Sequence, residues 1–262
     1  MIFLKHEIKM NLKALIIWSS SVGGMIFVML LVFPSMKDEL DGMTDMYANL
    51  GAFSSMFGME TLQMGNIMGF YGIEAGAMLS LGGSMFAAIL GAGILAKEEA
   101  NHTTEFIYVT PNTRTYFVTQ KVMAAGALIL AFNILCLLWS VVGIVAIGEE
   151  VAWDKLLLLQ LAQFVMHLEV GAICLGISSF MKKLNIGLGI GISLLLYFLH
   201  LIGNITDSVE KVHYVTPFYF CDAATVFKDT SIPMVYLLIG VGITIAAIVT
   251  AYVKYTKKDL SI

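Results

Sequence analysis

Charged residues are scarce in this sequence. Asp, Glu, Lys and Arg together make up 13% of its 262 residues, whereas hydrophobic residues make up 58%, and the mean hydropathy is +0.85. A soluble domain of this length carries a much larger charged surface. In lipid, every backbone polar group must be hydrogen-bonded within the protein, which favours spanning helices. The composition therefore predicts an all-α integral membrane protein, folded as a single transmembrane domain over residues 1–262.

Cysteine is also sparse, and the motifs of common ligand sites are missing. The three cysteines, Cys136, Cys174 and Cys221, are odd in number and far apart, so neither a disulfide framework nor a cysteine metal site is expected. No basic stripe indicates a nucleic-acid partner. No G-x-x-x-x-G-K-[ST] phosphate loop occurs, and no strand precedes the glycine-rich run 187–192. We therefore expect no catalytic residue, cofactor site or metal site in this chain.

Six long apolar stretches are present. Each is long enough for a helix that crosses a bilayer, which needs about 20 mostly apolar residues. The predicted spans are 14–33, 75–96, 123–147, 156–180, 186–203 and 232–252. An even number of spans places both termini on the same side of the membrane.

The basic residues are distributed unequally between the two sides. Eleven fall on the side of the termini and four on the other side. The positive-inside rule therefore predicts a multi-pass protein of the plasma membrane with both termini in the cytoplasm. On this topology the polar segment 97–121 is cytoplasmic and the segment 204–231 is extracellular.

Small residues recur at helical spacing in two of the spans. Gly187 and Gly191 form a G-x-x-x-G motif, and Gly83, Ala87 and Gly91 form a longer row with the same spacing. Such rows let helix backbones approach closely. We expect close helix packing at both places.

Three regions outside the spans have helical features. Residues 1–13 resemble an interfacial amphipathic helix, because leucine and isoleucine alternate there with lysines at helical spacing. We expect this helix to lie in the headgroup plane and to turn into the first span, the alternative being a frayed terminus. The outer segments 36–73 and 204–231 are too interrupted to span, and we expect short interfacial helices in both.

The outer segment 36–73 is also rich in methionine. Thioether sulfurs suit Cu(I), so a copper site is one interpretation. The chain has 17 methionines in total, many of them within spans. A flexible apolar lining is therefore the favoured interpretation.

The densest polar stretch is 97-KEEANHTTEFIYVTPNTRTYFVTQK-121. Residues 103–109 favour a short helix, which Pro111 ends because proline cannot continue the hydrogen-bond ladder. Acidic residues flank this helix on one side and Arg114 on the other. A short charged helix of this kind can dock in a groove of a soluble partner. An ordinary polar loop is the alternative.

This stretch resembles the link after the second span in the membrane subunits of ATP-binding cassette exporters of the type-two permease branch, the type V or ABCG-like fold. In that family the link contains an acidic pair, then T-x-E, then P-x-x-R and a closing lysine. The family pattern also has a glycine and a leucine, and at those positions this sequence has His102 and Thr104. An aromatic segment before the last span, 217-PFYFCD-222, matches as well. The matching residues of the link are Glu98, Glu99, Thr103, Glu105, Pro111, Arg114 and Lys121.

The resemblance implies a permease half-transporter that is not itself an enzyme. In such a transporter the link is a coupling helix that contacts a separate ATPase, which binds ATP and Mg. Two permease chains, identical or related, pair with two ATPases. Peptides, amphipathic drugs or lipids would leave between the permease chains, near spans two and five. The implied coupling residues are Glu98, Glu99, Thr103, Glu105, Pro111 and Arg114.

Polar residues also occur near the middle of the bilayer. His167 and Glu169 lie in the fourth predicted span, and Asn133 at similar depth in the third is the expected hydrogen-bond partner for them. Ionisable residues at that depth are costly and indicate a role. They could line a substrate path, bridge two permease chains or hold helices together, and the last is favoured because polar side chains often join helices in membranes.

Two other functions are possible. A metal-dependent intramembrane hydrolase would use Glu98, Glu99 and His102, but these lie in one loop and no H-E-x-x-H motif occurs. A carrier that does not use ATP would be expected to have inverted repeats, and none is visible.

Overall fold

The computed structural model describes residues 2–43, 46, 49–100, 113–181, 183, 185–205 and 207–258. Every regular element within these ranges is helical, and six helical segments are long and apolar enough to cross a membrane. The all-α class and the six predicted spans are therefore confirmed. The spanning elements are α1 (Ile2–Gly42), the continuous series α4 (Ile67–Phe70), η1 (Tyr71–Ala75) and α5 (Gly76–Ile94), then α8 (Arg114–Ala146), α9 (Trp153–Ser178), α10 (Ile186–Gly203) and α12 (Met234–Lys257).

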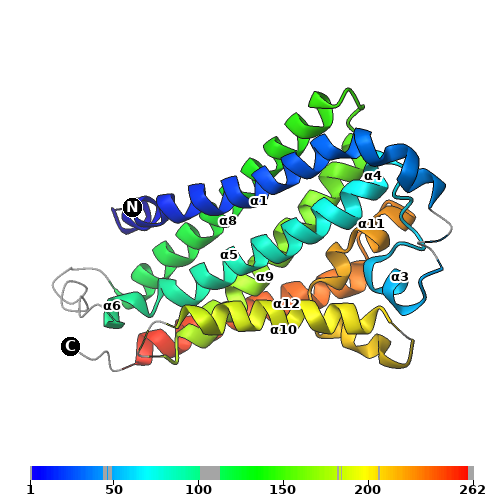
Figure 1. The fold of residues 1–262 in the computed structure, drawn as a ribbon. Helices are drawn as coiled ribbons and strands as arrows, with labels where there is room; N and C mark the ends of the chain where they lie inside the picture. The colour runs from blue at the N-terminus through cyan, green and yellow to red at the C-terminus, as the bar shows by residue number, and fades with distance from the viewer. Residues whose placement is uncertain are drawn as a thin grey trace.

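Short helices lie at the ends of the bundle. In Figure 1 the start of α1, the end of α12 and α6 (Lys97–Ala100) lie at one end, and α3 (Ala52–Phe57), α4 and α11 (Ala223–Asp229) lie at the other. The segment between α10 and α12 also contains η2 (Asp207–Tyr214) and η3 (Tyr219–Cys221). The first helix therefore starts at the same end of the bundle at which the last helix finishes, and short helices form in both outer segments, as predicted.

The first helix differs from its prediction. A turn was expected near residue 13, but α1 runs without a break from Ile2 to Gly42. The residues at the expected turn, Lys13, Ala14 and Leu15, are good helix formers, and no glycine or proline interrupts them. Residues 2–13 of the amphipathic segment are therefore the first part of one long helix.

The second span also begins earlier than predicted. Its helical path starts at Ile67 rather than at residue 75, and it includes a π-helical turn from Tyr71 to Ala75. The prediction placed the boundary after Glu74 because that residue is charged. One carboxylate within a π-turn does not end the helix, since the backbone hydrogen bonds continue through it.

Small residues bring α5 and α9 into close contact at the centre of the bundle. A Cβ added at Gly91 would lie 2.1 Å from the carbonyl oxygen of Gly171, and one at Gly83 would lie 2.3 Å from the His167 ring. The packing predicted for the row from Gly83 to Gly91 is confirmed.

The packing predicted for Gly187 and Gly191 is wrong within this chain. A Cβ at Gly191 would meet nothing within 4 Å, and one at Gly187 would meet only Asn185 of the same helix cap. Gly189 makes the contact instead, with the Ala88 carbonyl oxygen 2.8 Å from its ideal Cβ. The helix rotation that brings Gly189 against α5 turns its neighbours two residues away to other faces.

Candidate functional site

The polar stretch 97–121 is held at both of its ends. The residues Glu98 and Glu99 lie in α6, and Arg114 begins α8. Thr113 caps α8 by accepting a hydrogen bond from the backbone N–H of Tyr116. Thr103, Glu105, Pro111 and the expected helix 103–109 lie outside the described residues.

Lys121 is the centre of an ion cluster at this end. Its side chain is fully buried, and its ammonium donates to the Ile94 carbonyl oxygen at 2.5 Å, to Glu98 Oε1 at 2.5 Å and to Glu7 Oε1 at 2.9 Å. Three acceptors match the three N–H donors of the ammonium. Glu7, itself buried in α1, also binds Lys97. The cluster therefore joins α1, the end of α5, α6 and α8.

Burial raises the pKa of the Glu98 carboxyl above its ordinary value, and the nearby Lys121 ammonium offsets only part of that effect. Two carboxylates share this one buried ammonium. The contact between Glu7 and Lys97 supplies a second positive charge and brings the cluster close to charge balance.

A second set of contacts attaches the end of α12. Lys258 donates to Glu99 Oε2 and to the Met181 carbonyl oxygen, both at 2.5 Å. Arg114 Nη1 in turn donates to the Lys258 carbonyl oxygen at 2.5 Å. These bonds connect α12 with α6, with the start of α8 and with the segment that follows α9.

We call the charged residues of the two sets the terminal network: Glu7, Lys97, Glu98, Glu99, Arg114, Lys121 and Lys258. Aromatic rings support it, with Phe117 of α8 stacked on Tyr255 of α12 at 6.1 Å between centroids and edge-on to Phe3 of α1 at 5.4 Å. Sequence reasoning did not find Glu7, Lys97 or Lys258 as members of the site. The sequence feature that could have indicated this network is Glu7, the one acidic residue among the first 13.

A buried polar cluster lies near the middle of α9. His167 Nδ1 is 3.2 Å from Asn133 Oδ1, and its Nε2 is 3.2 Å from the Leu79 carbonyl oxygen. Gln160 Nε2 donates to the same Asn133 oxygen at 3.1 Å. The contact expected between His167 and Asn133 is present, and the cluster joins α5, α8 and α9.

Glu169 lies on a different face of α9. A Cβ added at Gly240 of α12 would lie 2.2 Å from Glu169 Oε2, so this carboxyl packs directly against the α12 backbone. Residues two positions apart on a helix point about 200° apart. The structure therefore separates Glu169 from His167, and the two do not form one site.

An apolar groove adjoins the terminal network. It has a volume of about 180 Å³, and α1, α5 and α10 line it. Trp18 and Phe86 form part of its wall with their ring centroids 6.4 Å apart. Asn11 and Lys97 supply polar groups to its lining. A groove of this composition suits an amphipathic molecule.

The arrangement of the acidic pair bears on the hydrolase alternative. Glu98 binds Lys121, whereas Glu99 binds Lys258, so the two carboxylates serve different ion pairs. Within the described ranges, no group of three His, Cys, Asp or Glu side chains is placed to hold a metal ion. His102 lies outside those ranges.

Comparison with known proteins adds one finding. A family model described as "ABC-2 family transporter protein" matches residues 1–260. Neither the curated proteins nor the solved structures give a match.

Proposed function

Because the chain belongs to the ABC-2 transporter family, we propose that it is the permease half of an ATP-driven exporter. In this proposal the stretch 97–121 docks on a separate ATP-binding cassette ATPase, which binds ATP and Mg. Two permease chains, identical or related, pair in the membrane and carry a peptide, an amphipathic drug or a lipid-like molecule outward.

The terminal network is the observation that carries this proposal. A docking segment transmits force only if it is rigidly attached to the helices that must move. The buried ion pairs Lys121–Glu98 and Lys258–Glu99 attach α6 to α8 and to the end of α12. Lys121 also binds Glu7 of α1 and the Ile94 carbonyl oxygen at the end of α5. Removing one partner of a buried ion pair costs about 3–5 kcal/mol, so these contacts favour keeping α6 attached to the helices. Motion of the segment would therefore move α1, α5, α8 and α12 together.

The charge distribution supports a cytoplasmic position for this end. The first part of α1 and the last part of α12 both contain lysines, and these two helix ends lie at the end of the bundle where α6 lies (Figure 1). The positive-inside rule then directs this end to the cytoplasm of the plasma membrane, where an ATPase has access to ATP.

The apolar groove supports an amphipathic cargo. It combines aromatic and aliphatic side chains with Asn11 and Lys97 at the same end as the terminal network. A molecule with an apolar body and a polar head could partition into it from the inner leaflet. Lys97 also binds Glu7, so cargo in the groove would contact a residue of the network directly.

Purification with the native partner tests the proposal. The full chain, tagged and expressed in its own host, is expected to copurify with a subunit that carries a phosphate-loop motif and hydrolyses Mg-ATP in nanodiscs. A chain that moves cargo without any such subunit would instead be a carrier and would refute the proposal.

Charge reversal within the stretch tests the docking role. We expect Glu105→Lys to lower ATPase stimulation by the permease several-fold while leaving membrane insertion intact. Arg114→Glu should have the same effect on stimulation, with an added loss of the contact to the end of α12. Glu150→Lys, an equal charge change at an exposed position of the opposite end, is the matched control. Equal effects of Glu105→Lys and Glu150→Lys would count against docking through this stretch.

A further inference from the structure

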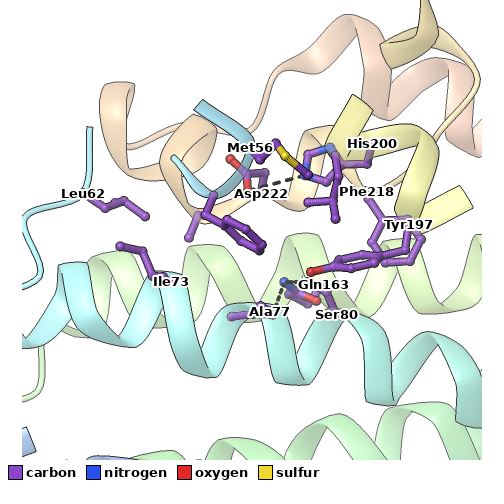
Figure 2. Close-up of a pocket in the computed structure, with 15 residues that line it drawn as sticks. Met56, Leu62, Ile73, Ala77, Ser80, Gln163, Tyr197, His200, Phe218 and Asp222 are labelled. Carbon is purple, nitrogen blue, oxygen red and sulfur yellow. Dashed lines mark hydrogen bonds and ion pairs between the residues drawn. The ribbon is translucent and has the colours of Figure 1, made fainter. Parts of the chain in front are cut away.

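A small pocket lies at the end of the bundle opposite the terminal network (Figure 2). It has a volume of about 30 Å³ and lies between α5, α9, α10 and the segment that carries Phe218 and Asp222. A cavity of this size holds about two water molecules at most. Its polar lining consists of Ser80, Gln163, Tyr197, His200 and Asp222.

Two buried polar atoms of this lining have no hydrogen-bond partner within the described part of the chain. Gln163 Nε2 donates to Ser80 Oγ at 2.6 Å and to the Cys221 carbonyl oxygen at 3.2 Å, which leaves Oε1 without a donor. His200 Nδ1 is likewise without a partner, although the residue is only 4% exposed. An unsatisfied buried polar atom costs about 1–3 kcal/mol. Water in the pocket can satisfy both atoms, because it donates and accepts.

The other nitrogen of His200 faces a carboxylate. His200 Nε2 lies 3.6 Å from Asp222 Oδ1, and Figure 2 shows the two side chains meeting above the pocket. Asp222 Oδ2 also accepts hydrogen bonds from the backbone N–H and the hydroxyl of Thr225, at 3.1 and 3.3 Å, and so caps α11. This pair of side chains connects the end of α10 to the start of α11.

Asp222 is ionised at neutral pH. Burial by itself would raise the pKa of this carboxyl, but its contacts with His200 and Thr225 outweigh burial and hold the pKa below its ordinary value. The carboxylate therefore contributes its stabilisation above the unfolded pKa, about 3.9, and loses it only as the pH falls through the lower folded value.

The pair is within reach of the surrounding medium. Asp222 also lines a larger cleft of about 520 Å³ that contains the polar side chains of Glu60, Asn204, His213, Lys228 and Asp229. Asp222 lines both the cleft and the pocket, so the route we infer for a proton to His200 passes this carboxylate.

The groups that face His200 come from each element around it. His213 of η2 has its ring centroid 6.5 Å from that of His200, and Asp222 at the start of α11 faces His200 as well. Its own helix contributes Asn204, whose Nδ2 lies 3.4 Å from His200 Nε2, and Tyr197 of the pocket. The lining from α3, α5 and α9 includes Met56, Ser80 and Gln163, none of which titrates in the physiological range.

We propose that His200 and Asp222 form a proton-operated latch that fastens the end of α10 to α11 when His200 is protonated through the water-filled pocket. An imidazolium donates from both nitrogens, to Asp222 on one side and to pocket water on the other, and that water can donate to Gln163 Oε1. A neutral imidazole donates from one nitrogen only and loses the charge attraction to Asp222. The latch therefore holds while His200 is protonated and loosens when it loses its proton.

Distance measurements on the chain alone test the latch. Spin labels at Ile202→Cys on α10 and Lys228→Cys on α11 occupy exposed positions, and the three native cysteines are buried. In nanodiscs, the distance between labels is expected to be shorter and its distribution narrower at pH 5.5 than at pH 8. Both pH values lie above the range in which Asp222 loses its charge.

Variants of the two partners identify the groups responsible. His200→Gln and Asp222→Asn should each abolish the pH response, and asparagine retains the capping ability of Asp222. His6→Gln, which removes an exposed histidine of α1, is the matched control and should leave the response unchanged. His213→Gln should also leave the pH response unchanged, because His213 is not a member of the pair.

Three results would overturn the latch: a distance that does not change with pH, a response that persists in His200→Gln, or a response that disappears only in His213→Gln. The experiment needs no ATPase and exposes both faces to the same pH. Its failure is therefore separate from a failure of the proposed export function or of the proposed orientation.

Discussion

Lys121 illustrates how single residues organise this protein. An ammonium buried without partners is very costly, yet here each of its three donors meets an acceptor from a different part of the chain. The acceptors include Glu7 and Glu98, two carboxylates that would repel each other without the lysine between them. A residue that the sequence analysis identifies only as the closing lysine of a family pattern is therefore the centre of a buried network.

Removing Lys121 should strongly destabilise the protein. We expect Lys121→Met to lower the free energy of unfolding by about 3–5 kcal/mol, because it removes the ammonium that two buried carboxylates share. Lys9→Met, which removes an exposed lysine of α1, should change it by less than about 0.5 kcal/mol. Unfolding by denaturing detergent, followed by circular dichroism, measures both. Similar stabilities for the two variants would show that the network contributes little.

At the scale of elements, α5 and α9 form the centre of the bundle through small residues. Gly91 and Gly171 let the two backbones touch, and Gly83 makes room for the His167 ring. The polar contacts of His167 and Gln163 then form across the same interface. Close approach and hydrogen bonding depend on each other here, because the bonds are possible only at this helix separation.

A methyl group at Gly91 should force the two helices apart. We expect Gly91→Ala to destabilise the protein by about 1–3 kcal/mol, the usual cost of overpacking. Gly126→Ala on α8, where a Cβ meets nothing within 4 Å, should be neutral or stabilising by up to about 1 kcal/mol through helix propensity. The same detergent unfolding assay compares the pair. A Gly91→Ala variant as stable as Gly126→Ala would contradict the close packing of α5 and α9.

At the scale of the whole molecule, the two ends differ in chemistry. One end carries the start of α1, the end of α12 and the terminal network, while the other carries α3, α4 and α11 (Figure 1). The polar cleft and the pair of His200 and Asp222 belong to this second end. Between them, large apolar side chains of α1, α8 and α12 are exposed over much of their length. These faces suit lipid or a second permease chain.

The orientation can be tested by labelling from one side. We expect Ser231→Cys, at an exposed position before α12, to react with a membrane-impermeant maleimide in intact cells. His6→Cys on α1 should react only after the membrane is permeabilised. The parent chain, whose native cysteines are buried, gives the background. The reverse pattern would place the terminal network outside the cell and rule out docking of a cytoplasmic ATPase.

The sequence by itself determined the membrane class, the six spans and the shared end of the two termini. These properties depend on the local density of apolar residues, since about 20 of them in succession suffice to cross the bilayer. It also indicated His167 and Asn133 as partners, because both are polar at the same depth in consecutive spans.

Only the tertiary structure decided which side chains meet across the spans. Glu7 reaches Lys121 across 114 positions, and His200 meets Asp222, because packing sets the rotation of each helix about its axis. The same rotation turned Gly189 rather than Gly187 toward α5 and moved Glu169 away from His167. Apolar periodicity is weak in helices that are hydrophobic on every face, so it does not specify that rotation.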